Sequence, residues 1–309
     1  MKLKTTFTSL ALTLMLGSGT ALADINIGVL MPQFDDIWLT YLREDMAAKA
    51  KTMPDGVKLQ FVDARTDVNK QLDQVHDLIG KKVDALIVNP VDTAATAAIT
   101  KAALAAGIPL VYVNRSPDDP KLPEGVATVI SDEKEAGRLQ MQYVADKLGG
   151  KGKIVVLLGD LANNATRNRT DGVKEILAKY PDIKIDEEQT GIWQRQRGMD
   201  ITNDWLTQGR EFNAVVSNND EMAIGAAMAL KQAGKKPGDV VIAGVDGAQD
   251  GLRAVKTGML TVSVFQDAKG QANGSLETAV KMVKKEKIDT QTMVIPYRLI
   301  TAENVDTFK

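Results

Sequence analysis

The sequence contains no cysteine and one histidine among its 309 residues. Without cysteine the chain has no disulfide framework, no thiolate metal site and no cysteine nucleophile. His76, the one histidine, falls in a stretch with helical spacing (67–82), where we expect a surface or packing residue and not a catalytic base. The sequence also lacks a Gly-rich phosphate loop, a G-x-S-x-G elbow and a D-x-[DN]-x-[DN]-G calcium loop. The sequence therefore does not support an enzymatic function, and we expect the protein to hold no metal and no cofactor.

A large charge of one sign is also missing. The formal net charge is −2, and basic and acidic residues are scattered along the chain. Such a distribution offers no binding surface for nucleic acid or for an anionic membrane.

Long apolar runs are absent as well, and the N-terminus carries only a short one. Lys2 and Lys4 precede the apolar stretch 9–15, and small residues lead to Ala21-Leu22-Ala23. This order is typical of a secretory signal peptide, and the apolar stretch is shorter than the roughly 20 residues of a spanning helix. We therefore predict that residues 1–23 are a signal peptide, that Asp24 becomes the first mature residue, and that the product is soluble and periplasmic.

Apolar runs rich in valine and isoleucine alternate with amphipathic stretches through the rest of the chain. The three clearest helical stretches are 67–82, 132–148 and 219–233, and Asp67 is placed to cap the first. Strands are predicted at 25–31, 57–62, 85–89, 110–114, 126–131, 153–158, 183–186, 214–217, 240–245, 260–265 and 293–297. Apolar strands separated by helices indicate parallel sheets covered on both faces. We predict an α/β fold, and the chain length favours two domains.

Polar and aromatic side chains follow one predicted strand after another. In open parallel sheets ligands bind at the carboxyl ends of the strands, so these residues are the candidate site. They are Asp35, Asp36, Trp38, Asn114, Arg115, Arg169, Trp193, Asn219, Asp246 and Gln266.

This set of residue types suits a polyhydroxylated ligand. Each hydroxyl both donates and accepts, planar Asp, Asn, Gln and Arg groups engage neighbouring hydroxyls in pairs, and the C–H faces of a ring stack on tryptophan. Each residue also has a simpler role open to it. Asn219 and Asp220 could cap a helix, Asp246-Gly247 could form a turn, and either tryptophan could belong to the core. Their repeated placement at strand ends favours the binding interpretation.

Five segments carry a resemblance to a known family. VDALIVNP (83–90), IPLVYVNR (108–115), SNNDEMAIGA (217–226), GVDGAQDG (244–251) and GMLTVSVFQ (258–266) match, in this order, the sugar-binding periplasmic proteins of ABC transporters. The resemblance is to the ribose- and galactose-binding group, and within it to the inositol- and rhizopine-binding branch. It implies the ten ligand-binding residues named above, with three departures. Ile37 replaces an aromatic residue, Asp36 stands where that group commonly has proline, and Asn114 replaces an acid, which weakens the case for ribose.

The resemblance implies two similar lobes joined by a three-crossing hinge, with the ligand cleft between them. The N-terminal lobe would comprise 24–131 plus 267–295, and the C-terminal lobe 132–266 plus 296–309. Trp38 and Trp193 would lie on opposite faces of the ligand ring, and hinge closure would bury it; periplasmic binding proteins are the standard example of this motion.

The expected function is capture of a cyclitol, with myo-inositol favoured, for delivery to a membrane ABC transporter permease. An aldose such as ribose or galactose, or an amino-cyclitol whose ammonium pairs with a carboxylate, stays open. A chemoreceptor could be a second partner, and a monomer is expected. A carbohydrate-acting enzyme is a weaker alternative, and a lactose-repressor-type regulator is disfavoured because a signal peptide stands where its helix-turn-helix would be.

Overall fold

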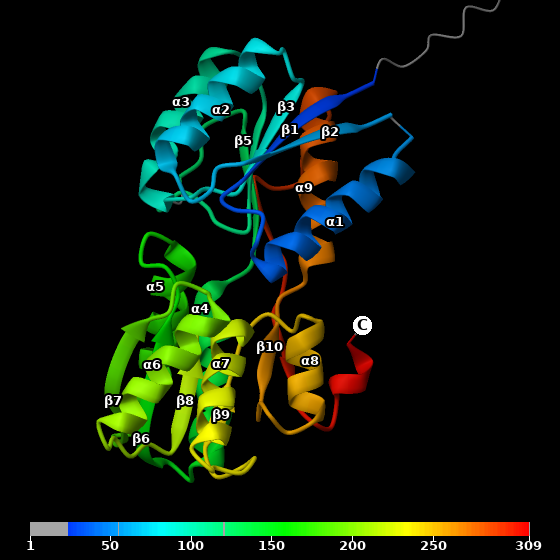
Figure 1. Cartoon of the computed structure of the whole chain (residues 1–309). Coiled ribbons are helices and arrows are strands. Elements are labelled where there is room, and N and C mark those ends of the chain that lie inside the picture. The colour runs from blue at the N-terminus through cyan, green and yellow to red at the C-terminus, as the bar shows by residue number, and fades with distance from the viewer. Residues whose placement is uncertain (1–23, 55, 120, 309) are drawn as a thin grey trace, which may run out of the picture.

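A computed structural model describes residues 24–54, 56–119 and 121–308, and they form two α/β lobes stacked along the long axis of the molecule (Figure 1). The signal peptide predicted at 1–23 lies outside the described residues. Within the described part of the chain, no helix is both long and apolar enough to cross a membrane.

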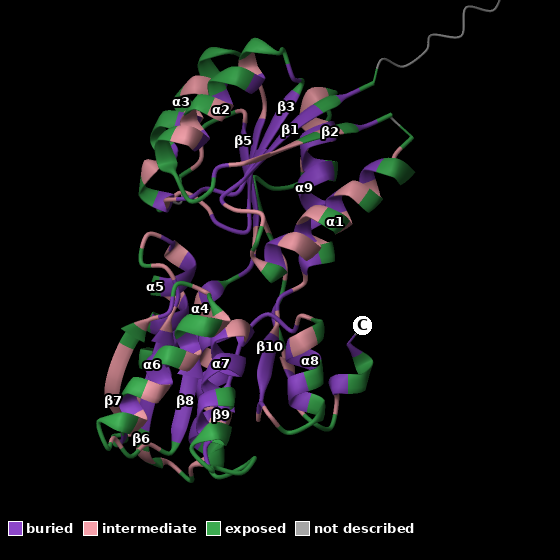
Figure 2. Cartoon of the chain, in the orientation of Figure 1, coloured by how far each residue is buried: buried purple, intermediate pink, exposed green. Residues whose placement is uncertain are grey.

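The first lobe is built on a six-stranded parallel sheet in the order β11-β5-β4-β3-β1-β2. Its strands are β1 (Asn26–Met31), β2 (Lys58–Asp63), β3 (Ala85–Val88), β4 (Leu110–Val113), β5 (Val126–Ile130) and β11 (Thr292–Val294). One face packs on α1 (Ile37–Thr52) and α9 (Ala268–Val283), and the other on α2 (Val68–Gly80) and α3 (Thr96–Ala105), which the 3-10 helix η1 (Thr93–Ala95) precedes. Because helices cover both faces, the central strands are buried along their length (Figure 2).

The second lobe has a four-stranded parallel sheet in the order β7-β6-β8-β9 and a two-stranded antiparallel sheet, β10-β12, beside it. Its strands are β6 (Lys151–Leu158), β7 (Asp182–Thr190), β8 (Ala214–Ser217), β9 (Val241–Ala243), β10 (Ser263–Phe265) and β12 (Arg298–Ile300). Helices α4 (Glu133–Lys147) and α5 (Asn164–Leu177) cover one face of the four-stranded sheet. Helices α6 (Arg195–Thr207), α7 (Asp220–Gln232) and α8 (Gln249–Lys256) cover the other, and the 3-10 helix η2 (Val305–Thr307) lies near the C-terminus.

The predicted fold class is confirmed: parallel sheets flanked by helices form two lobes. The helices predicted at 67–82, 132–148 and 219–233 are α2, α4 and α7, and the Asp67 side chain caps α2 by accepting from the backbone N–H groups of Asn69 and Lys70. His76 lies exposed on α2, as expected of a surface residue.

One predicted strand was wrong. Residues 293–297 form no single strand, because β11 ends at Val294 and β12 begins at Arg298, in different sheets. Pro296 lies between them and has no N–H to give to a strand ladder, so the chain is free to leave one sheet and enter the next. The antiparallel pairing of β10 with β12 was not predicted either.

The chain passes between the two lobes at three places. It leaves the first sheet after β5, returns between β10 and α9, and passes again between β11 and β12. In Figure 1 these connections run side by side in the middle of the molecule. They lie where the predicted lobe boundaries fall, and the boundary residues themselves stay a prediction.

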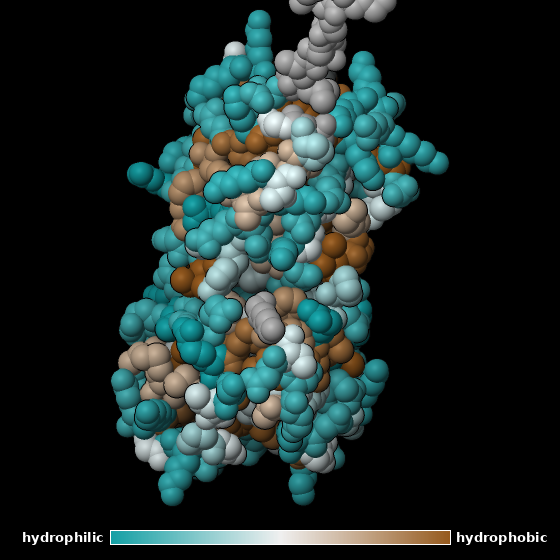
Figure 3. Space-filling model, turned by 90° about the vertical axis from the view of Figure 1, so that its right-hand side faces the viewer, coloured by the Kyte–Doolittle hydropathy of each residue, from teal (hydrophilic) through white to brown (hydrophobic). Residues whose placement is uncertain are grey.

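One face of the molecule is seen in Figure 3. This face is largely hydrophilic, and hydrophobic residues show between the polar side chains. Such a surface is ordinary for a protein whose apolar residues fill its sheets and helix interfaces.

Candidate ligand-binding site

A small cavity lies between the lobes, where the carboxyl ends of strands from both sheets face each other. Nine of the ten predicted site residues line it. They are Asp36, Trp38, Asn114, Arg115, Arg169, Trp193, Asn219, Asp246 and Gln266, and Leu39 and Ala165 complete the wall. Asp35, the tenth, is exposed and is not among the lining residues. Topology therefore gathers side chains that lie up to 230 positions apart in sequence.

Larger hollows lie near this cavity, and two of them have empty volumes of about 900 and 1,170 Å³. They are grooves in the surface, and the first is lined by exposed or half-buried polar side chains such as Asp118 and Arg167. The smaller cavity differs in that two arginines, Arg115 and Arg169, are buried on its wall. Buried charged groups that converge on a cavity are typical of a binding site, so we take the smaller cavity as the candidate site.

The first lobe contributes Asp36, Trp38, Asn114 and Arg115. Asp36 caps α1, because its Oδ1 accepts from Leu39 N at 2.9 Å, and this role turns the carboxylate towards the helix start. Burial raises the pKa of Asp36 above its ordinary value, and the Leu39 N–H and Arg115 oppose the shift. Burial lowers the pKa of Arg115 to about 10, against the attraction of Asp36. Asp36, which is half-buried, and Arg115, which is buried, therefore attract each other on this wall of the cavity.

The second lobe contributes Arg169, which has four acceptors around its guanidinium group. Its Nε donates to Glu133 Oε2 at 2.6 Å and its Nη1 to the backbone oxygen of Asn218 at 2.6 Å. Its Nη2 donates to Gln266 Oε1 and to the Tyr297 hydroxyl, both at 3.1 Å. Tyr297 in turn donates to Glu133 Oε2 at 2.8 Å. These contacts hold the guanidinium in one orientation, with Asp246 Oδ1 3.8 Å from Nη1.

Trp193 lies in the turn that follows β7. Its indole Nε1 donates to Asn163 Oδ1 at 3.0 Å, and its backbone oxygen accepts from Asn219 Nδ2 at 3.1 Å. Gly159 lies against the ring, since a Cβ there would come within 2.2 Å of two indole carbons. Asn219 also caps α7 through its Oδ1, so its capping role and its place on the cavity wall coexist.

The turn that follows Asp246 is bonded to a second buried carboxylate, Asp220. The turn after Asp246 gives its Gly247 N–H to Asp220 Oδ2 at 2.8 Å, and Ser263 Oγ donates to Asp220 Oδ1 at 2.6 Å. Burial raises the pKa of Asp220 to about 7, although both hydrogen bonds favour the charged form. Burial also raises the pKa of Asp246, and Arg169 opposes that shift.

Two further features mark the cavity wall. Asn114, Trp193 and Asp246 all have positive φ, at 65°, 67° and 129°, a backbone state that costs free energy in residues other than glycine and that gathers at ligand sites. Gln266 Nε2 is buried with no hydrogen-bond partner, while its Oε1 is engaged by Arg169. An unpaired buried donor is costly, so a ligand oxygen placed beside it would be favoured.

The sequence reasoning missed three supporting residues: Glu133, Tyr297 and Asn163. Glu133 and Tyr297 orient Arg169, and Asn163 orients Trp193. Glu133 stands among the acids in the first turn of α4, and nothing in the sequence separates it from Glu135. Asn163 is adjacent to Asn164 at the start of α5, and Tyr297 follows a proline in the wrongly predicted strand. Across the described residues, no group of three or more His, Cys, Asp or Glu side chains is arranged to hold a metal ion.

Comparison with known proteins decides the family. Residues 27–287 match the family described as periplasmic binding protein domain. The chain belongs to this family. It is 48% identical over 286 residues to a putative rhizopine-binding protein of Rhizobium meliloti, with 92% of each protein covered. It is 38% identical to a xylitol-binding protein of Mycolicibacterium smegmatis, covering 87% of this chain and 75% of that protein.

A solved structure agrees with this placement. An ABC transporter solute-binding protein of Bacillus halodurans with bound myo-inositol superposes on this chain with a TM-score of 0.86 at 39% identity, covering 92% of this chain and 96% of that one. Periplasmic binding proteins of this kind are solute-binding components of ABC transporters and not enzymes. The resemblance drawn from the five sequence segments is therefore confirmed.

Proposed function

We propose that this protein captures myo-inositol in the periplasm and delivers it to an ABC transporter permease. The export signal would be residues 1–23, and the working form would be a monomer whose lobes close on the ligand. The nine convergent side chains of the interlobe cavity carry this proposal. They combine two tryptophans with a set of planar polar groups, and Gln266 Nε2 among them has no partner in the protein.

The residue types on the two walls fit a ring that presents hydroxyls around its edge. Trp38 comes from the first lobe and Trp193 from the second, so two indoles are available to the apolar faces of one ring. Asp36 and Asp246 accept from hydroxyls, Arg115 and Arg169 donate, and Asn114, Asn219 and Gln266 can do both. The myo-inositol bound by the relative from Bacillus halodurans supports the choice of a cyclitol.

An amino-cyclitol is the second candidate, because acidic groups outnumber basic groups in and beside the cavity. Asp36, Asp246 and Glu133 lie in or beside the cavity, against Arg115 and Arg169. Burial raises the pKa of both Asp36 and Asp246, so keeping either carboxylate charged costs free energy. A ligand ammonium beside either group would stabilise its charged form.

Calorimetric titration of the protein, unfolded and refolded to remove carried-over ligand, tests the proposal. The panel is myo-inositol, scyllo-inosamine as an amino-cyclitol, ribose, galactose and glucose. We expect one-to-one binding of myo-inositol with a Kd on the order of micromolar or tighter. Tighter binding of scyllo-inosamine would transfer the assignment to amino-cyclitols, and tight binding of an aldose alone would overturn the cyclitol assignment.

A further inference from the structure

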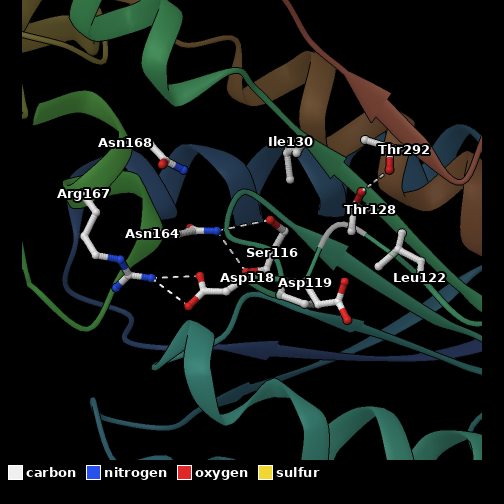
Figure 4. A pocket seen from close by; sticks show the side chains of 11 residues that line it. Ser116, Asp118, Asp119, Leu122, Thr128, Ile130, Asn164, Arg167, Asn168 and Thr292 are labelled. Carbon is white, nitrogen blue, oxygen red and sulfur yellow. Dashed lines mark hydrogen bonds and ion pairs between the residues drawn. The ribbon is translucent and has the colours of Figure 1, made fainter. Parts of the chain in front are cut away.

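A short segment at the start of α5, Ala162–Arg167, bonds directly to the first lobe across the cleft. The Ala162 oxygen accepts from Thr93 N at 3.2 Å, and Asn164 Nδ2 donates to the Ser116 backbone oxygen at 3.0 Å. Arg167 Nη2 donates to both carboxylate oxygens of Asp118, at 2.8 and 2.9 Å (Figure 4). The structure is thus a closed form, and we call Ala162–Arg167 the rim segment.

The rim contacts differ in their exposure to water. The Arg167 and Asp118 side chains are 43% and 46% exposed, so solvent screens their attraction. Asn164 and Ser116 are half-buried. Asn163 is fully buried, and its Nδ2 donates to the Val91 oxygen of the first lobe at 2.9 Å.

Asn163 has an unusual position for its role. It is the N-cap residue of α5, where asparagine normally accepts from the first backbone N–H groups of the helix, yet its side chain makes no such bond. Its Oδ1 instead accepts from the indole N–H of Trp193, and its Nδ2 donates to Val91. Because an indole only donates and a carbonyl only accepts, one orientation of the amide satisfies both partners.

We propose that Asn163 is a positioning residue that couples ring binding at Trp193 to closure of the lobes. A ring stacked on Trp193 holds the indole, the indole N–H holds the amide, and the amide then faces Val91 across the cleft. Opening of the lobes breaks the bond to Val91 and leaves the amide without that partner. Ring stacking on Trp193 and closure of the lobes therefore stabilise each other. The inference rests on the proposed site, because it takes Trp193 to be a ligand contact.

The test is a double-mutant cycle on the ligand dissociation rate, measured by stopped-flow tryptophan fluorescence with myo-inositol as the probe. Asn163→Ala removes both amide bonds, and Trp193→Phe keeps an aromatic face but removes the N–H. Asn164→Ala is the matched control, since it also deletes an amide that spans the cleft but makes no bond to Trp193. Thermal melts of each variant establish that it is folded.

We expect Asn163→Ala to raise the dissociation rate about tenfold and to leave the association rate within about threefold. In the Trp193→Phe background, Asn163→Ala should raise the dissociation rate by no more than about threefold, because the indole no longer holds the amide. The effect of Asn164→Ala should be the same in both backgrounds. Equal effects of Asn163→Ala in both backgrounds, or no effect in either, would overturn the coupling.

Failure of the proposed ligand and failure of the coupling are separable. If calorimetry shows that the protein binds an aldose and not a cyclitol, the ligand assignment fails. The same cycle is then measured with that aldose, and the difference between backgrounds still decides the role of Asn163.

Discussion

The buried pair Arg169–Glu133 yields the sharpest prediction about stability. Their side chains are 4% and 6% exposed, and Arg169 Nε lies 2.6 Å from Glu133 Oε2. Arg169→Met leaves Glu133 as a buried carboxylate whose one remaining hydrogen-bond partner is the Tyr297 hydroxyl. Removing one member of a buried ion pair costs about 3–5 kcal/mol, so we expect a loss of this size in the free energy of unfolding.

The double variant Glu133→Gln, Arg169→Met should be more stable than Arg169→Met alone. The second substitution removes the unpaired charge, and glutamine still accepts from Tyr297. The Asn218 oxygen and Gln266 Oε1 stay unpaired in both variants, at about 1 kcal/mol each, and the buried Asp246 carboxylate loses Arg169 in both. Because these losses are common to the two variants, we expect the double variant to recover about 2 kcal/mol over Arg169→Met and to remain less stable than the wild type.

Urea unfolding of the ligand-free proteins at pH 7, with slopes compared among variants, measures these differences. Both variants should lose ligand binding, because Arg169 lines the cavity. The reasoning is refuted if the double variant is no more stable than Arg169→Met, since burial of an unpaired charge would then not be the source of the loss.

Two further predictions concern the site and its support. Gly159→Ala should weaken ligand binding at least tenfold by displacing the Trp193 ring, whereas Gly80→Ala, at a position with open space around it, should leave the affinity unchanged; equal calorimetric Kd values for the two variants would contradict this. Burial raises the pKa of Asp220 from 3.8 to about 7, so the native state keeps a proton that the unfolded chain has lost, and stability should fall as pH rises from about 4 to about 7. Asp220→Asn does not titrate and should flatten this dependence in urea unfolding measured across that range; an unchanged slope would rule Asp220 out as a source of it.

Much of the fold could be predicted because local patterns specify it. Valine- and isoleucine-rich runs mark strands covered on both faces, and the helical spacing of Leu72, Val75, Leu78 and Ile79 marks α2, which packs on the first sheet through those residues. The segment 293–297 could not be assigned by the same means. Its apolar residues suit a strand, but its path is decided by which sheet edge is open on each side of Pro296, and that depends on the rest of the fold.

The site was predictable where topology and the family resemblance agree. Residues that follow parallel strands meet at the cleft, and this rule together with the resemblance selected nine side chains that line one cavity. It could not choose between Asp35 and Asp36, which are adjacent; the N-cap bond to Leu39 orients Asp36, while Asp35 stays exposed. Nor could it separate Glu133, which contacts Arg169, from Glu135, which pairs with Arg138 on the helix surface. The first choice depends on local cap geometry, and the second depends on a contact between α4 and α5.

A crystal structure of the refolded protein with myo-inositol tests the central claim most directly. The account predicts one ring in the interlobe cavity, with its faces towards Trp38 and Trp193. One hydroxyl oxygen should lie within hydrogen-bonding distance of Gln266 Nε2, and another near the Asp246 carboxylate. A ring found in the groove lined by Ser116, Asp118 and Arg167, or a cavity left empty at saturating ligand, would contradict the account.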